Sequence, residues 1–117
     1  MTYQSEQFNF GEPDEWRSLS HRWLAFDRSN PRVYDLFKQF AFQSINAGAE
    51  HCSGQLVVER IRWEVAIQTL GEEFKVPNEY IPFMSRRFMT DFPTHWGFFE
   101  IRRSEADGLY PSPKKHR

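Results

Sequence analysis

The stretch NPRVYDLFKQFAFQSINAG, residues 30–48, has the pattern of one amphipathic helix with a start and a stop signal. Asn30 is a favoured N-cap residue, Pro31 suits the first helical position, and Gly48 is typical of a helix end. Apolar residues three and four positions apart form one stripe: Val33, Leu36, Phe37 and Phe40. Phe42 falls on the opposite, polar face, so either a neighbouring element covers it or it contacts a partner.

Further along the chain, the residues from Gly54 to Leu70 predict a helix with two apolar faces, and Ser53 is its expected N-cap. One face holds Val57, Val58, Ile61 and Val65, and the other holds Leu56, Trp63, Ile67 and Leu70. A surface helix has one apolar stripe, so two stripes indicate burial on both sides. Either this is the central helix of the domain, or its second face belongs to a second subunit of a homodimer.

The remaining predicted elements flank these two helices. Pro13 and an acidic first turn predict a helix over Asp14–Phe26, and Asn78 is the expected N-cap of a helix that ends at Phe92. Short strands are predicted over Glu73–Val76 and, from alternating polarity, over Phe98–Arg103. Because these strands bracket the last helix, we expect a mainly α fold, a four-helix domain with a short two-stranded β ribbon that resembles a winged helix.

The length and composition fit one soluble globular domain. A chain of 117 residues builds a single core, and twelve Phe, four Trp and four Tyr mean that rings supply much of it. We expect a polar N-terminal arm over residues 1–12, a single helical domain over 13–105, and a flexible basic tail over 106–117.

The charge and the cysteine content limit which cellular compartment and which binding partners we expect. The net charge of −1 excludes a global basic field, which leaves only a local basic patch for nucleic acid. Cys52 is the single cysteine, so no internal disulfide forms, as is usual in a reducing cytosol. No apolar run has the length of a signal peptide or a membrane span, so we expect a cytoplasmic protein, in a bacterial or host cytosol, with no membrane partner.

The sequence contains no recognisable catalytic or metal-binding constellation. The glycines form no phosphate loop, and the four histidines lack ligand spacing: His21, His51, His95 and His116. A nucleophilic Cys52 with His21 or His95 as its base is the one enzymatic alternative. We therefore expect a non-enzymatic protein that uses neither a metal nor another cofactor.

Two sets of residues are candidates for binding. The candidates for contact with double-stranded DNA are Lys75, Asn78, Arg86, Arg87, Arg102 and Arg103. Their cations suit phosphates, and the Asn side chain suits a base edge. The candidates for contact with a protein are Phe42, Leu56, Trp63, Ile67, Leu70 and Phe98. Large aromatic side chains of this kind dominate the energetics of protein interfaces.

Four motifs occur in a fixed order: FDRSNPRVYDLF at 26–37, ERIRWEV at 59–65, FKVPNEYIPFMSRRFM at 74–89 and FFEIRR at 98–103. Together they resemble a family of small uncharacterised proteins encoded by phages, prophages and some bacterial genomes. That family shows Asn-Pro-x-Val-Tyr, Ile-Arg-Trp and Phe-Lys-x-x-Asn-x-Tyr motifs, although Pro77 here replaces an Asn that its members tend to have. The resemblance implies a phage or mobile-element context and names no activity.

Two functions follow as expectations. The first is a winged-helix-like module that binds double-stranded DNA. The alternative is a protein-binding inhibitor or adaptor that acts on a host enzyme or defence system, in an anti-CRISPR-like or anti-restriction-like manner. A contiguous basic face around Arg86 and Arg102 would favour DNA, whereas a mixed face that carries Phe42 or the second stripe of the Trp63 helix would favour a protein partner.

Overall fold

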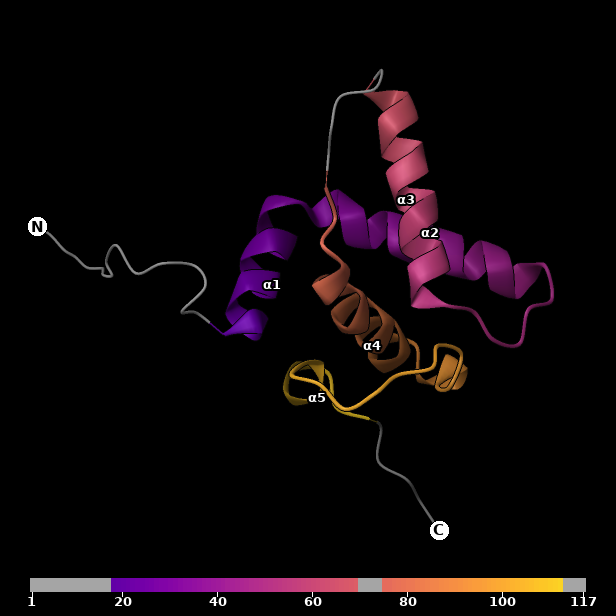
Figure 1. Cartoon of the computed structure of the whole chain (residues 1–117). Coiled ribbons are helices and arrows are strands. Elements are labelled where there is room, and N and C mark those ends of the chain that lie inside the picture. Colours follow the sequence, from indigo (N-terminus) through magenta and orange to yellow (C-terminus); the bar gives the residue numbers. More distant parts are fainter. Residues whose placement is uncertain (1–17, 70–74, 113–117) are drawn as a thin grey trace, which may run out of the picture.

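A computed structural model describes residues 18–69 and 75–112 of the chain, which are arranged as helices and connecting turns (Figure 1). In chain order the elements are α1 (Leu19–Ser29), α2 (Pro31–Asn46), α3 (Gly54–Gln68), the 3-10 turn η2 (Asn78–Tyr80), α4 (Ile81–Asp91), the 3-10 turn η3 (Pro93–His95) and the short α5 (Ala106–Leu109). Helix α2 packs against α1, α3 and α4, and α4 also packs against α3 and α5. The mainly helical expectation is therefore confirmed.

The prediction of a two-stranded β ribbon is wrong. Within the described ranges the only β pairing is an isolated parallel bridge between Cys52 and Phe99, where the Cys52 N–H donates to the Phe98 carbonyl oxygen at 3.0 Å. Phe98 and Phe99 are both buried, so the apparent alternation over Phe98–Arg103 does not correspond to one inner and one outer face. Residues 75 and 76 are irregular, and the rest of the predicted strand Glu73–Val76 lies outside the described residues. Without a ribbon there is no wing, and the winged-helix resemblance fails.

Helix α1 begins later than predicted and also ends later. Its N-cap is Ser18, whose Oγ accepts a hydrogen bond from the His21 N–H at 3.1 Å. The predicted start near Asp14 lies outside the described residues. The helix continues to Ser29 and buries Trp23 completely.

Helix α2 follows the predicted pattern closely. Pro31 is its first residue, the predicted stripe is buried, and Gly48 adopts a φ of +103° just beyond the end of the helix. Asn30 precedes the helix, but its side chain accepts no hydrogen bond from the first turn; its Nδ2 donates to the Phe26 carbonyl oxygen at 3.0 Å. Tyr34 and Ala41 extend the buried surface beyond the predicted stripe.

Helix α4 differs from the prediction at its start and in its burial. A 3-10 turn over Asn78–Tyr80 precedes it, so Asn78 is not its N-cap. Pro82 lies in the first turn, where a missing N–H costs no helical hydrogen bond. The helix buries Phe83, Met84, Ser85, Phe88 and Met89, because α2, α3 and α5 pack around it.

The first turn of α3 approaches α4 so closely that a side chain at position 54 would clash with two side chains of α4. An alanine there would place its Cβ 2.4 Å from Ser85 Oγ and 2.8 Å from Ile81 Cγ2. We expect Gly54→Ala to lower the free energy of unfolding by about 1–3 kcal/mol, because the Ser85 and Ile81 side chains must shift to admit the methyl group. Urea denaturation monitored by circular dichroism measures the loss.

Gly108 provides the matched control for this substitution. It lies in the helical segment α5, and an added Cβ there meets no atom within 4 Å. We expect Gly108→Ala to change the free energy of unfolding by less than about 1 kcal/mol and to favour the fold, since alanine is the better helix former. Equal losses at both positions would contradict the close approach of α3 and α4.

Residues 105–110, which belong largely to the segment expected as a tail, pack on α1 and α4. The Ser20 N–H and Oγ donate to Glu105 Oε1 at 2.9 and 2.8 Å, and these bonds hold the pKa of Glu105 below its usual value. The Trp23 Nε1–H donates to the Tyr110 hydroxyl at 2.9 Å. We call residues 105–110 the C-terminal clasp.

The core consists mainly of rings, as the composition predicted. Its densest part is a cluster around Phe88, whose ring lies 5.0–6.5 Å from the ring centroids of Phe37, Phe42, Phe92, His95, Phe98 and Phe99. We call this group the Phe88 cluster. It joins α2 and α4 to the segment that follows α4 and thereby fixes the position of residues 97–104.

Candidate functional site

The six candidates for contact with a protein separate into two groups. Phe42 and Phe98 belong to the Phe88 cluster, where Phe42 packs edge-on against Phe92 at 4.9 Å and Phe98 is buried. A neighbouring element therefore covers Phe42. Leu70 lies outside the described residues.

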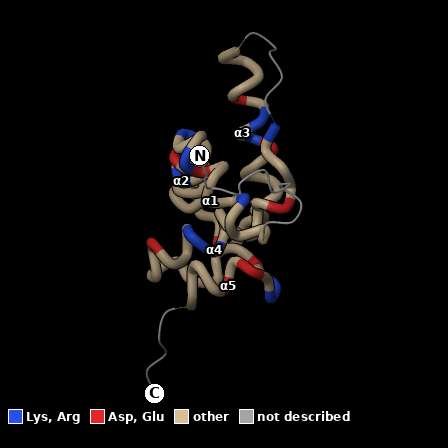
Figure 2. The backbone as a smooth tube through the Cα atoms, turned by 90° about the vertical axis from the view of Figure 1, so that its left-hand side faces the viewer, with Lys and Arg blue, Asp and Glu red and all other residues tan. Residues whose placement is uncertain are grey.

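The other three candidates share one face of α3 and project into solvent. Leu56, Trp63 and Ile67 are 63%, 65% and 54% exposed, and we call this face the α3 stripe. The opposite face of α3 is buried, so the interpretation of α3 as a central helix covered on both sides is wrong. Figures 1 and 2 show the C-terminal half of α3 extending beyond the rest of the described chain. This projection leaves the stripe uncovered by any described element.

Polar side chains beside the stripe are held by the rest of the fold. The Arg60 guanidinium lies 4.4 Å from the centroid of the Phe40 ring. Arg62 pairs with Glu59 at 3.1 Å and donates to Asn78 Oδ1 at 2.8 Å. These contacts fix the flanks of α3 and leave the apolar stripe between them.

Arg86 is tied into the C-terminal clasp. Its side chain is 12% exposed, pairs with Asp107 at 2.9 Å, and donates from Nε to the Tyr110 carbonyl oxygen at 2.6 Å. The guanidinium also lies 5.4 Å from the centroid of the Trp96 ring. An arginine held in this way connects α4 to the clasp and presents little charge to a DNA backbone.

Arg87 is also occupied by contacts within the fold. It pairs with Asp27 at 3.0 Å and with Asp91 at 3.8 Å, and its guanidinium lies 3.9 Å from the Tyr34 ring centroid. The Tyr34 hydroxyl donates to Asp91 at 2.8 Å. The pKa of the Tyr34 phenol lies far above its usual value, mainly because the hydroxyl is buried and also because of this hydrogen bond. The network joins α1, α2 and α4.

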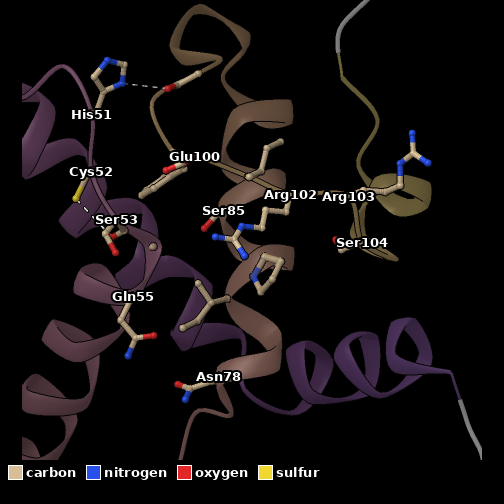
Figure 3. A pocket seen from close by; sticks show the side chains of 16 residues that line it. His51, Cys52, Ser53, Gln55, Asn78, Ser85, Glu100, Arg102, Arg103 and Ser104 are labelled. Atoms are coloured by element: carbon tan, nitrogen blue, oxygen red, sulfur yellow. Dashed lines mark hydrogen bonds between the residues drawn. The ribbon is translucent and has the colours of Figure 1, made fainter.

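Three of the six DNA candidates line one groove: Asn78, Arg102 and Arg103 (Figure 3). The groove has a volume of about 1170 Å³ and lies between the first turn of α3, the start of α4 and residues 97–104. In Figure 3 the Arg102 side chain points into the groove beside Ser85, whereas Arg103 points away. Lys75 is exposed and is not among the residues that line the groove.

The same groove contains residues that the sequence did not indicate. Gly54 and Ser85 meet where α3 approaches α4, and both line the groove. The available sequence signals were a glycine directly after an N-cap serine and a lone serine within an apolar helix. Neither pattern identifies a site before the helices are packed together.

The enzymatic alternative gains no support from the positions of the histidines. Cys52 Sγ contacts the carbonyl oxygen of its own neighbour Ser53 at 3.6 Å, and His95 packs in the Phe88 cluster. In residues 18–69 and 75–112, no group of three His, Cys, Asp or Glu side chains could hold a metal ion. Over those same ranges, no helix is both long and apolar enough to cross a membrane.

Comparison with protein-family models, curated proteins and solved structures finds no significant match to this chain. The resemblance to phage-encoded proteins therefore stays a prediction.

Proposed function

We propose that this protein is a non-enzymatic binding module that docks onto another protein through the α3 stripe. The observation that carries this proposal is the exposure of Leu56, Trp63 and Ile67 on one face of a helix that is buried on the other. Exposed apolar patches on soluble domains mark interaction surfaces, and Trp is among the residues that contribute most to them.

The spacing of the stripe favours a helical partner. Trp63 follows Leu56 by seven positions and Ile67 follows Trp63 by four, which is the spacing of apolar residues along a coiled-coil seam. An amphipathic helix of the partner fits such a seam, with its own apolar anchors against the stripe. Glu64 flanks the seam, so a basic residue on the partner would complement it.

The phage or prophage context implied by the sequence motifs agrees with the inhibitor or adaptor function expected from the sequence. Such a module acts by occupying a surface of a host enzyme or defence protein, which needs an interface and no catalytic group. Binding of double-stranded DNA has less support, because Arg86 and Arg87 are engaged in ion pairs and the Asn78 Oδ1 accepts from Arg62.

Substitution of the stripe tests this proposal. We expect the double variant Trp63→Ala, Ile67→Ser to reduce capture of the partner from host-cell lysate by at least about thirtyfold, since hot-spot truncations cost 2 kcal/mol or more. Leu24, which is 36% exposed on α1, supplies the control, and Leu24→Ser should capture the same protein as the unaltered chain. Equal capture by the stripe variant and the unaltered chain would refute the proposal.

The oligomeric state of the purified protein separates a foreign partner from a second copy. We expect a monomer in analytical ultracentrifugation. A dimer that Trp63→Ala converts to a monomer would mean that the stripe is a self-association surface, and the proposal of a host-protein partner would fall.

A further inference from the structure

We propose that the groove between α3 and residues 97–104 binds the phosphate group of a small phosphate monoester. The site is separate from the α3 stripe. Its donors come from three elements: the first turn of α3, Ser85 of α4, and Arg102 of the segment after η3.

The first turn of α3 supplies backbone donors. The Leu56 N–H is bonded to Ser53 Oγ at 3.3 Å and the Val57 N–H to the Ser53 carbonyl oxygen at 3.2 Å. In the described part of the chain, the N–H groups of Gly54 and Gln55 have no acceptor. Unpaired N–H groups and the positive end of the helix dipole favour an oxyanion at this place.

Ser85 is an independent observation that points to a ligand. Its residue is only 3% exposed, it lines the groove, and its hydroxyl forms no hydrogen bond within the described residues. Buried hydroxyls are nearly always hydrogen-bonded in folded proteins. The 2.4 Å between Ser85 Oγ and a Cβ built on Gly54 places this hydroxyl directly at the first turn of α3. The hydroxyl is therefore an available donor at the wall of the groove, next to two free N–H groups.

Arg102 supplies the compensating charge. Neither Arg102 nor Arg103 forms an ion pair with any described residue, and the Arg102 side chain points into the groove beside Ser85 (Figure 3). Glu100 is the only carboxylate among the lining residues, and Arg102 is the cation that points into the groove with it. Asn78 adds an amide Nδ2, since its Oδ1 is already used by Arg62. The balance of charge and donors favours a tetrahedral oxyanion.

The apolar part of the groove identifies the rest of the ligand. Ile81, Pro82, Phe99 and Ile101 line the groove together with these donors. A phosphate attached to a small organic body uses both the donors and the apolar wall. The phosphodiester backbone of duplex DNA fits less well, because Ser85 is recessed and buried.

Amide-resolved NMR titration tests the site. The probes are inorganic phosphate and phenyl phosphate, at constant ionic strength maintained with chloride. We expect the Gly54 and Gln55 amide signals to shift on titration, and phenyl phosphate to bind at least about tenfold more tightly than inorganic phosphate, because its ring reaches the apolar wall.

Variants of the two arginines make the test specific. We expect Arg102→Gln to weaken phenyl phosphate binding about tenfold or more, and Arg103→Gln, which removes the same charge from a side chain that points away, to weaken it less than threefold. Ser85→Ala should weaken binding by several-fold while the fold, judged from dispersion of the amide spectrum, is retained.

Four results would overturn the inference. The first is the absence of shifts at Gly54 and Gln55 up to about 20 mM phosphate. The second is equal weakening by the two arginine variants, and the third is equal affinity for inorganic and phenyl phosphate. The fourth is that duplex DNA binds more tightly than phenyl phosphate and that this binding depends on both arginines. That result would assign the groove to nucleic acid instead. None of these results depends on the α3 stripe, so they leave the proposed protein-docking function unaffected.

Discussion

Alanine in place of Trp23 is expected to lower the free energy of unfolding by about 3–5 kcal/mol. The indole is fully buried, stacks on Phe83 with ring centroids 5.8 Å apart, and lies 5.7 Å from the Tyr80 ring. Its Nε1–H also donates to the Tyr110 hydroxyl at 2.9 Å. Truncation therefore opens a cavity between α1 and α4 and removes one of the donors that hold the C-terminal clasp.

The same substitution at Trp63 is the internal control. Trp63 is 65% exposed, so Trp63→Ala should change the free energy of unfolding by no more than about 0.5 kcal/mol. Guanidinium denaturation of both variants measures the difference. Trp23→Phe separates packing from hydrogen bonding, with an expected loss of about 1–2 kcal/mol. Similar losses for the two alanine variants would refute the placement of Trp23 in the core and of Trp63 on the surface.

Phe88→Ala is expected to have an effect of similar size, about 3–5 kcal/mol. Phe88 is completely buried at the centre of the Phe88 cluster, and its nearest ring neighbours are Phe42 at 5.0 Å and Phe92 at 5.1 Å. Removal of the ring separates α2 from α4 and loosens the attachment of Phe99, which positions residues 97–104. Urea denaturation gives the loss of stability.

Leucine at the same position distinguishes lost volume from lost ring contacts. Phe88→Leu keeps most of the apolar volume, and we expect it to cost less than about half of the alanine loss. This variant also keeps the prediction testable if the alanine variant does not fold. An alanine variant within about 1 kcal/mol of the unaltered protein would mean that the Phe88 cluster does not organise the core.

The sequence predicts best where the signals are local. Helix α2 has its start residue Pro31, its apolar stripe and its stop glycine Gly48 within one continuous segment, and the structure reproduces all three. Ser53 likewise caps α3 as expected. A cap or a stripe acts within a few residues of itself, so these features need no knowledge of the rest of the fold.

The predictions failed where distant residues decide the outcome. The alternating polarity over 98–103 does not reveal whether a second strand is available to pair with this segment. Phe98 and Phe99 are both buried against α2 and α4, so packing and not strand pairing decides the structure there. The availability of Arg86 and Arg87 depends on Asp107 and Asp27, which are 21 and 60 positions away along the chain. Local sequence patterns span only a few residues, so they cannot reveal ion pairs between residues this far apart in the chain.

The two candidate surfaces also differ in how far local sequence signals predict them. The spacing of Leu56, Trp63 and Ile67 identified a second apolar face on α3, but only the fold shows that nothing described covers it. The groove was invisible in the sequence because it arises where Gly54 lets α3 approach α4. Sequence patterns thus identified a surface on one helix and three residues that line the groove, Asn78, Arg102 and Arg103, but not the groove itself.

The C-terminal clasp also has a consequence for synthesis of the protein on the ribosome. Its contacts join Ser20 to Glu105 and Trp23 to Tyr110, pairs that are 85 and 87 positions apart. A ribosome adds about 5–20 residues per second, so the nascent chain carries Trp23 for roughly 4–17 s before Tyr110 is even polymerised. Throughout that interval the indole lacks its hydrogen-bond partner. The clasp therefore makes completion of the fold wait for completion of translation through residue 110.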